Sequence, residues 1–229
     1  MRLWLFMAGL VACGSDNQAD PIDTDTSDSD PDTDTETDAD TDTDTDTDTE
    51  TDTDTDSTPS AVIERNFSPM CSVYNQLYPG VGEEGHWAAS RITPSNTPFT
   101  LEKVVIEVSD DAFCDGGQSF TAEVWIETAL SPSASPTVLE RFDLPAASPA
   151  GGLRSLEATL STPVMVDGGE HIFISLQLAD DSACIRTCAD AGAIDRNYWS
   201  SAVTPPFSWV TLQSFGIQSD LIIEAHGFH

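Results

Sequence analysis

The amino-acid sequence predicts an all-β protein. The expected fold is an antiparallel β-sandwich, jelly-roll-like, preceded by a signal peptide and a disordered acidic linker. Three observations support this. Residues 59–229 contain many short runs in which apolar and polar side chains alternate, separated by Gly, Pro, Asn, Asp and Ser. No run keeps the 3.6-residue period of an amphipathic helix. The segment before Pro59 is nearly free of apolar side chains after an apolar N-terminus.

The N-terminus has the features of an export signal. Arg2 is followed by the apolar run Leu3 to Ala12, which is too short to span a bilayer as a helix and is typical of a signal-peptide core. The run ends Leu10-Val11-Ala12-Cys13, which resembles the lipobox of bacterial lipoproteins. The resemblance implies that residues 1–12 are removed and that Cys13 is lipidated. The alternative is an ordinary secretory signal with a chance cysteine.

An acyl anchor would give the protein a membrane partner, since each buried methylene adds about 0.8 kcal/mol of binding free energy. Gly14, rather than aspartate, follows Cys13. In the lipoproteins that the motif resembles, this favours the outer membrane. We therefore expect an outer-membrane lipoprotein, facing the periplasm or exposed on the cell surface.

Residues 13–58 are expected to be a disordered linker. Residues 14–58 contain 19 acidic and no basic residues, and they include the run TDTDTDTDTETDTDTD. As a strand, this run would have one threonine face and one carboxylate face, with nothing to bury and with repulsion between like charges. Fully stretched, the segment would reach roughly 150–160 Å. We expect it to act as a tether between the anchor and a single folded domain, residues 59–229.

The charge of the chain argues against two classes of partner. The formal net charge is −32, and residues 59–229 alone carry 21 acidic and 7 basic residues. Without a basic stripe, the chain is not expected to bind nucleic acid. The same acidity argues against docking on an anionic membrane surface through charge.

The strands of the domain are predicted from alternation. The clearest set is Ile172, Ile174, Leu176 and Leu178, within Glu170 to Leu178. The other predicted strands are Ala61 to Phe67, His86 to Ile92, Leu101 to Val108, Phe120 to Glu127, Val138 to Leu144, Leu156 to Leu160, Pro163 to Val166, Asn197 to Ser201, Phe207 to Leu212 and Leu221 to Ala225.

Several segments of the domain resemble known exported domains. They are YPGVGEEGHWAASRITPSNTPFTLEKVVIEV, AEVWIE, TPVMVDGGEHIFISLQL, NYWSS and DLIIEAHG, within Tyr78 to Gly227. The pattern is similar to the β-sandwich domains appended to many bacterial surface and secreted proteins. The resemblance implies a sandwich fold and an extracytoplasmic location, and it carries no active site.

Four cysteines remain after Cys13: Cys71, Cys114, Cys184 and Cys188. An even number in an exported chain indicates two disulfides, with three possible pairings. A zinc site with four cysteine ligands is the weaker alternative, because Cys71 and Cys114 are isolated in the sequence.

No catalytic or cofactor-binding motif is present. A hydrolase with a dispersed site would need His86 or His171 to meet a carboxylate in a deep pocket. His226 and His229 lie at the C-terminus, where disorder is the ordinary expectation.

A structural Ca²⁺ is the one ion that the pattern suggests. Two predicted strands are each followed by one residue, Asp-Asp, two residues and Cys, at Cys114 and at Cys184. If the two loops converge, their carboxylates could share Ca²⁺. The candidate ligands are Asp110, Asp111, Asp115, Asp180 and Asp181. The alternative is acidic surface without an ion.

Aromatic side chains suggest a carbohydrate ligand. If Val124 and Ile126 face the core, Trp125 faces away from it, and Phe173 and His171 likewise point away from the Ile174 face. Such residues could stack on a sugar ring, or else pair across strands beneath a loop.

Together these features predict a cell-envelope lipoprotein that presents a non-catalytic sandwich for surface binding or adhesion to a carbohydrate or another envelope component. The alternatives are an envelope hydrolase and a purely structural envelope protein.

Overall fold

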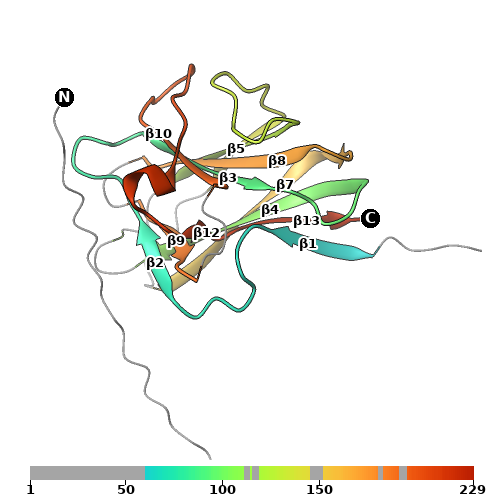
Figure 1. The fold of residues 1–229 in the computed structure, drawn as a ribbon, viewed down its shortest axis with the longest axis horizontal. Helices are drawn as coiled ribbons and strands as arrows, with labels where there is room; N and C mark the ends of the chain where they lie inside the picture. Colours follow the sequence, from blue (N-terminus) through green and yellow to red (C-terminus); the bar gives the residue numbers. More distant parts are fainter. Residues whose placement is uncertain (1–59, 111–113, 115–118, 145–151, 180–182, 191–194) are drawn as a thin grey trace, which may run out of the picture. The chain divides into compact units, whose positions relative to one another are not determined.

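The fold consists of two antiparallel β-sheets packed face to face (Figure 1). The structure is a computed structural model that describes residues 60–110, 114, 119–144, 152–179, 183–190 and 195–229. In Figure 1 a six-stranded sheet forms the upper layer and a seven-stranded sheet the lower one. Within these residues there is no α-helix, only the 3₁₀ turn η1 (Leu212–Phe215). The predicted antiparallel β-sandwich is confirmed.

The seven-stranded sheet has the order β1-β13-β4-β9-β12, with β7 paired to β4 and β2 paired to β9. Its strands are β1 (Ala61–Arg65), β2 (Tyr74–Leu77), β4 (Phe99–Asp110), β7 (Gly152–Val166), β9 (Ile185–Cys188), β12 (Asp220–Leu221) and β13 (Ile223–Phe228).

The six-stranded sheet has the order β11-β10-β3-β8-β5-β6. Its strands are β3 (Trp87–Ile92), β5 (Phe120–Glu127), β6 (Glu140–Leu144), β8 (His171–Gln177), β10 (Asn197–Ser200) and β11 (Val210–Thr211). Consecutive strands repeatedly change sheet, from β3 to β4 to β5 and from β6 through β7, β8 and β9 to β10. These crossings are typical of jelly-roll-like sandwiches.

Most predicted strands are present, and the differences are local. β5 has the predicted bounds, while the two predicted strands 156–160 and 163–166 are parts of the single strand β7. The pairing of β7 with β4 shifts register between Leu101 and Lys103, which explains the break in alternation there. The four-residue strands β2 and β9 were not predicted, because neither carries a run of alternating apolar side chains.

The main core lies between the sheets and follows the alternation. Ile172, Ile174 and Leu176 of β8 are fully buried there, against residues of β4 such as Val104 and Ile106. Burying a side chain of this size contributes about 1.5–3 kcal/mol to folding. The two-residue period therefore assigns the other set of side chains on each strand to the outer faces.

A buried polar cluster joins the two sheets near one edge. Asn197 of β10 donates from Nδ2 to Asp220 Oδ1 of β12 at 2.7 Å. Its Oδ1 accepts from Asn66 Nδ2 at 3.1 Å and from the Leu221 amide at 3.2 Å. Asn66 also donates to Ser90 of β3. Asn66, Ser90, Asn197 and Asp220 are each at most 4% exposed.

The C-terminal residues belong to the sheet. β13 lies between β1 and β4, so His226 is held on a central strand of the seven-stranded sheet. The expectation of a disordered C-terminus at His226 and His229 is wrong, since His229 also packs against Phe99. No helix in the described part of the chain has the length and apolar character needed to cross a membrane.

Candidate functional site

The three predicted ligand-binding residues share the outer face of the six-stranded sheet. Trp125 of β5 lies opposite Phe173 of β8, and their rings stack with centroids 5.5 Å apart and an interplanar angle of 9°. Both pack with Ala89, Tyr198 and Trp209 in a cluster separate from the main core. His171 stands at the end of β8 on the same face.

Two loops cover this face. Residues 128–139 and 201–209 extend above the six-stranded sheet in Figure 1. They meet where the Phe207 amide donates to the Ala134 carbonyl at 2.6 Å and Trp209 Nε1 donates to the Ser133 carbonyl at 3.0 Å.

The covering corrects the expectation of an exposed aromatic surface. Trp125 and Phe173 are fully buried and His171 is 8% exposed, so none offers a ring face to a ligand in this structure. The arrangement is the alternative of cross-strand packing beneath a loop. Periodicity predicted correctly that these rings point away from the main core, but it carries no information about loops that fold over them.

Burial also shifts the pKa values of the ionisable groups around this cluster. Burial raises the pKa of Glu123, against the opposing effect of Arg141, whose Nη1 lies 3.3 Å from Glu123 Oε1. Burial raises the pKa of Glu127, although the Ser133 amide donates to it. Burial, followed by the charge of Arg91, lowers the pKa of His171.

Among the described residues, no hydrogen bond or ion pair joins either candidate histidine to a carboxylate. His171 Nδ1 lies 2.9 Å from Thr93 Oγ1, and His86 packs against the Trp199 ring in an edge arrangement. Burial lowers the pKa of His86, and the nearby charges of Glu83 and Glu84 oppose that shift. The described part of the chain therefore offers no support for the hydrolase alternative.

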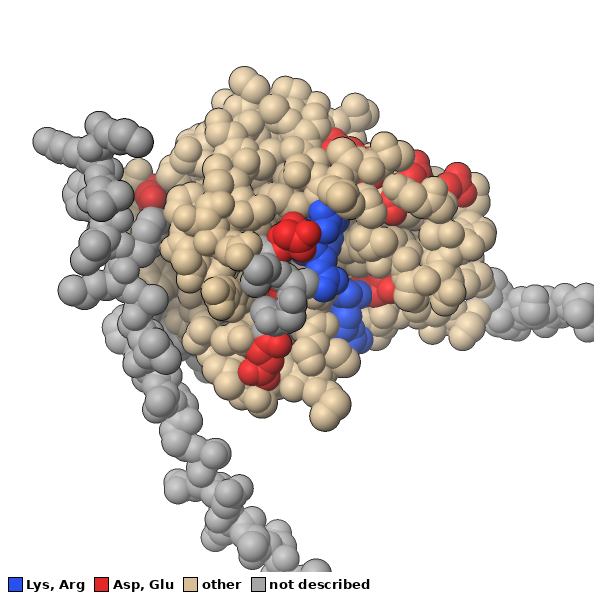
Figure 2. Space-filling model, in the orientation of Figure 1, with Lys and Arg blue, Asp and Glu red and all other residues tan. Residues whose placement is uncertain are grey.

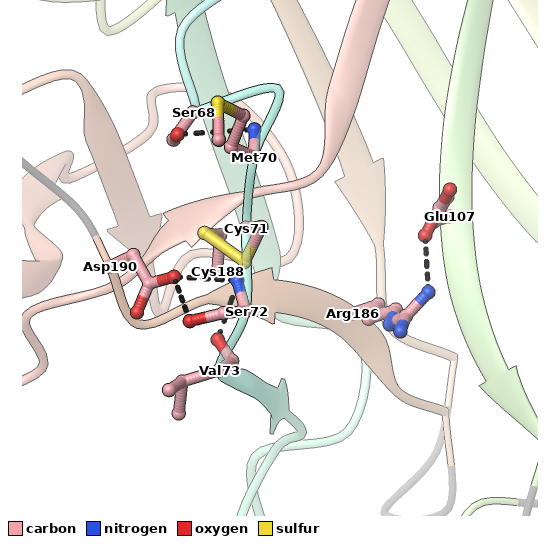
Figure 3. The surroundings of a disulfide bond; sticks show 9 residues. All are labelled: Ser68, Met70, Cys71, Ser72, Val73, Glu107, Arg186, Cys188 and Asp190. Atoms are coloured by element: carbon pink, nitrogen blue, oxygen red, sulfur yellow. Dashed lines mark hydrogen bonds and ion pairs between the residues drawn. A yellow bond between two sulfur atoms is a disulfide. The ribbon is translucent and has the colours of Figure 1, made fainter. Parts of the chain in front are cut away.

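The cysteines form two disulfides, as predicted. Cys71 is bonded to Cys188 (Figure 3), and Cys114 is bonded to Cys184. Cys71, Cys188 and Asp190 lie close enough together to resemble a metal site. The two disulfides use the sulfur atoms of all four cysteines, so the four-cysteine zinc site is excluded.

The second disulfide joins the ends of the two Asp-Asp-x-x-Cys segments. Consistent with this, the Ser109 amide donates to the Cys184 carbonyl at 3.2 Å. The side chain of Asp110 and residues Asp111, Asp115, Asp180 and Asp181 lie outside the described residues. The Ca²⁺ prediction therefore remains a prediction.

The outer face of the seven-stranded sheet holds an open groove. The groove has a volume of about 520 Å³ and runs over β1, β13, β4 and β7. Ile63, His226, Lys103 and Thr159 stand directly opposite one another on these four strands and line it as a row.

The sheet is irregular beneath this groove. Its register shifts at His226/Gly227 and between Leu101 and Lys103. A Cβ atom at Gly227 would lie 1.8 Å from the Thr100 carbonyl oxygen, so only glycine allows this approach of β13 to β4.

Ion pairs neutralise the basic residues beside the groove. Lys103 Nζ lies 2.9 Å from Glu157 Oε2, and this contact lowers the pKa of Glu157 through a hydrogen bond and the lysine charge. Glu224 is shared by Arg65 at 3.3 Å and His226 at 2.8 Å. In Figure 2 the Lys and Arg side chains on the visible face form one short stripe with Asp and Glu beside it.

Sequence reasoning missed Lys103, His226 and Thr159 as site residues. Each stands on the polar side of an alternating strand, which looks like ordinary solvated surface. These residues form one row because β1, β13, β4 and β7 pair in this order in the sheet, although β1 and β13 lie at opposite ends of the domain sequence.

No protein-family model matches the chain. No curated protein matches it either. Two solved structures of one clostridial protein are similar. The first contains the cysteine protease and lectin-like domains of Cwp84, a surface layer associated protein of Clostridium difficile, with 12% identity and a TM-score of 0.44. The match covers 73% of this chain and 36% of the Cwp84 chain.

The second is a variant of clostridial cysteine protease Cwp84 after propeptide cleavage, with 11% identity and a TM-score of 0.46. The match covers 73% of this chain and 40% of the Cwp84 chain. This chain thus matches less than half the length of either structure. At these scores the likeness assigns neither family nor function.

Proposed function

We propose that this chain is a lipid-anchored protein of the cell envelope whose β-sandwich binds carbohydrate, without catalysis, in the groove of the seven-stranded sheet. The observation that carries the proposal is the groove itself, since the opposite outer face is covered by loops. A purely structural envelope protein would not need such a concave surface.

The lining of the groove suits a sugar. Ala61, Val62 and Pro163 provide apolar contacts, while Lys103 and Thr159 provide polar groups. A sugar ring likewise combines apolar C–H faces with hydroxyl edges. A mostly apolar site with a few placed polar groups is the usual form of a small-molecule site.

The paired charges favour a neutral ligand. Lys103 and Arg65 are each matched by a carboxylate at 2.9 Å and 3.3 Å, and Glu102 adds a further carboxylate to the lining, so the groove carries no excess of positive charge and only a small excess of negative charge. A strongly charged polymer would gain little from such a surface, because electrostatic complementarity requires an excess of one sign.

The disulfides indicate where the protein works. Bonds such as Cys71–Cys188 and Cys114–Cys184 form and persist in oxidising compartments outside the cytoplasm. The lipobox at Cys13 and the acidic segment that follows it support anchoring with the sandwich held away from the membrane.

The test is binding of the full-length protein, in detergent, to arrays of neutral glycans and of peptidoglycan fragments, with Ca²⁺ and with a chelator. We expect binding to neutral glycans. Lys103→Ala should weaken it about tenfold, a loss of about 1.4 kcal/mol. Arg141→Ala is the matched control on the opposite sheet and should bind as wild type. No binding under either condition would contradict the proposal, and a gain that requires Ca²⁺ would support the predicted ion.

A further inference from the structure

Tyr74 is an exposed aromatic residue on the same sheet as the groove. It is the first residue of β2, and its side chain is 46% exposed. The Arg186 guanidinium lies 3.6 Å from the centre of its ring. Arg186 Nη1 is itself held 2.9 Å from Glu107 Oε2 (Figure 3). The ring is thus supported by an arginine that is fixed by a carboxylate.

The backbone around Tyr74 is fixed on both sides. Tyr74 of β2 lies opposite Cys188 of β9. Cys188 is bonded to Cys71, which lies three residues before Tyr74 in the chain. Ser72 donates to Asp190 Oδ2 from its amide at 2.6 Å and from its hydroxyl at 2.8 Å (Figure 3). The Ala189 amide donates to the Val73 carbonyl at 2.8 Å. A ring held in this way loses little conformational entropy when a ligand stacks on it.

Tyr74 and the groove lie on one face. Glu107, which pairs with the Arg186 beneath Tyr74, is on β4, and so is Lys103 in the groove. The two residues are four positions apart, so their side chains point to the same side of the sheet. At about 3.4 Å per residue they are separated by roughly 14 Å along the strand. A single sugar ring cannot cover that distance, whereas an oligosaccharide can.

We propose that Tyr74 is a second subsite, on which a sugar ring of the same chain stacks when a linear neutral glycan occupies the groove. Glu107, with 31% of its side chain exposed, is the carboxylate placed to accept hydrogen bonds from hydroxyls of that ring. This inference rests on the proposed function, and it adds that the ligand is a polymer longer than a disaccharide.

The test compares short and long oligosaccharides. Titration calorimetry of the full-length chain in detergent would use chito-oligosaccharides and cello-oligosaccharides of two to six rings. For wild type, we expect the hexamer to bind at least about tenfold more tightly than the dimer, the increment of about 1.4 kcal/mol that one stacked ring would supply. Tyr74→Ala should abolish the gain with length and leave dimer binding unchanged, and Tyr74→Phe should keep it.

Tyr78 supplies the matched control. It is 44% exposed but lies outside the strand, so Tyr78→Ala should bind every oligomer as wild type does. Thermal unfolding of each variant checks that it is folded. A wild-type hexamer affinity equal to that of the dimer, or a Tyr74→Ala variant that keeps the gain, overturns the second subsite while the groove stands. Failure of every oligomer and every arrayed glycan to bind overturns both proposals.

Discussion

Asp220 is a carboxyl group that the fold holds almost entirely away from water. It is 1% exposed and accepts a hydrogen bond from Asn197. Burial raises its pKa from 3.8 to about 6, while the Asn197 hydrogen bond and the Arg196 charge act in the opposite direction and Asp195 adds to the rise. Among the described residues no salt bridge to Asp220 is found, and the Asn197 amide is its side-chain hydrogen-bond donor.

The pKa of Asp220 predicts how stability depends on pH. Because the folded state binds this proton more tightly than the unfolded chain, its contribution is fully present below about pH 4 and is lost as pH rises through about 6. Asp220→Asn keeps the acceptor for Asn197 and removes the ionisation. We expect the variant to lose less stability than wild type between pH 4 and pH 7, by about 2–3 kcal/mol.

Chemical denaturation at pH 4, 5, 6 and 7 measures this difference. Wild type measured in the same buffers is the reference at each pH. Identical slopes in wild type and Asp220→Asn would show that Asp220 does not carry the effect.

Among the elements, β2 depends most on a covalent link. It is four residues long and pairs only with β9 in the described sheet. The Cys71–Cys188 disulfide closes a sequence separation of 117 residues and fixes the segment before β2 to that partner. Long closed loops give a disulfide its largest effect on the unfolded chain, typically about 2–4 kcal/mol.

Replacing both Cys71 and Cys188 by Ser should therefore free β2 while the main core stays folded. We expect limited proteolysis followed by mass spectrometry to find new cleavage within residues 66–78, and thermal unfolding to occur at a lower temperature. Under the same conditions the wild-type protein is the control. Resistance of the double variant to cleavage in this segment would mean that strand pairing alone holds β2.

At the scale of the whole molecule, the proposed lipid anchor is open to a direct test. The lipobox predicts lipidation of Cys13, and the acidic segment predicts separation of the sandwich from the membrane. Cys13→Ser removes the acyl chains, whose buried methylenes contribute about 0.8 kcal/mol each. We expect this variant in the soluble fraction after cell fractionation and wild type in the membrane fraction. Continued membrane association of Cys13→Ser would refute the lipid anchor.

Much of the fold could be predicted from alternation alone. The bounds of β5 and the inward set Ile172, Ile174 and Leu176 follow from a two-residue period, since one face of each strand must be buried. The formation of two disulfides followed from an even number of cysteines in an exported chain. Their pairing could not follow, because it depends on which strands become neighbours.

The sequence by itself determined that the protein is a β-sandwich and that Trp125 and Phe173 point away from its main core. Only the tertiary structure decided which outer face is open. Loops 128–139 and 201–209 bury the aromatic residues on the six-stranded sheet, while the row through His226 and Lys103 on the seven-stranded sheet lines a groove. The physical reason is that periodicity describes a strand and its two faces, whereas exposure depends on segments distant in the sequence that pack over those faces.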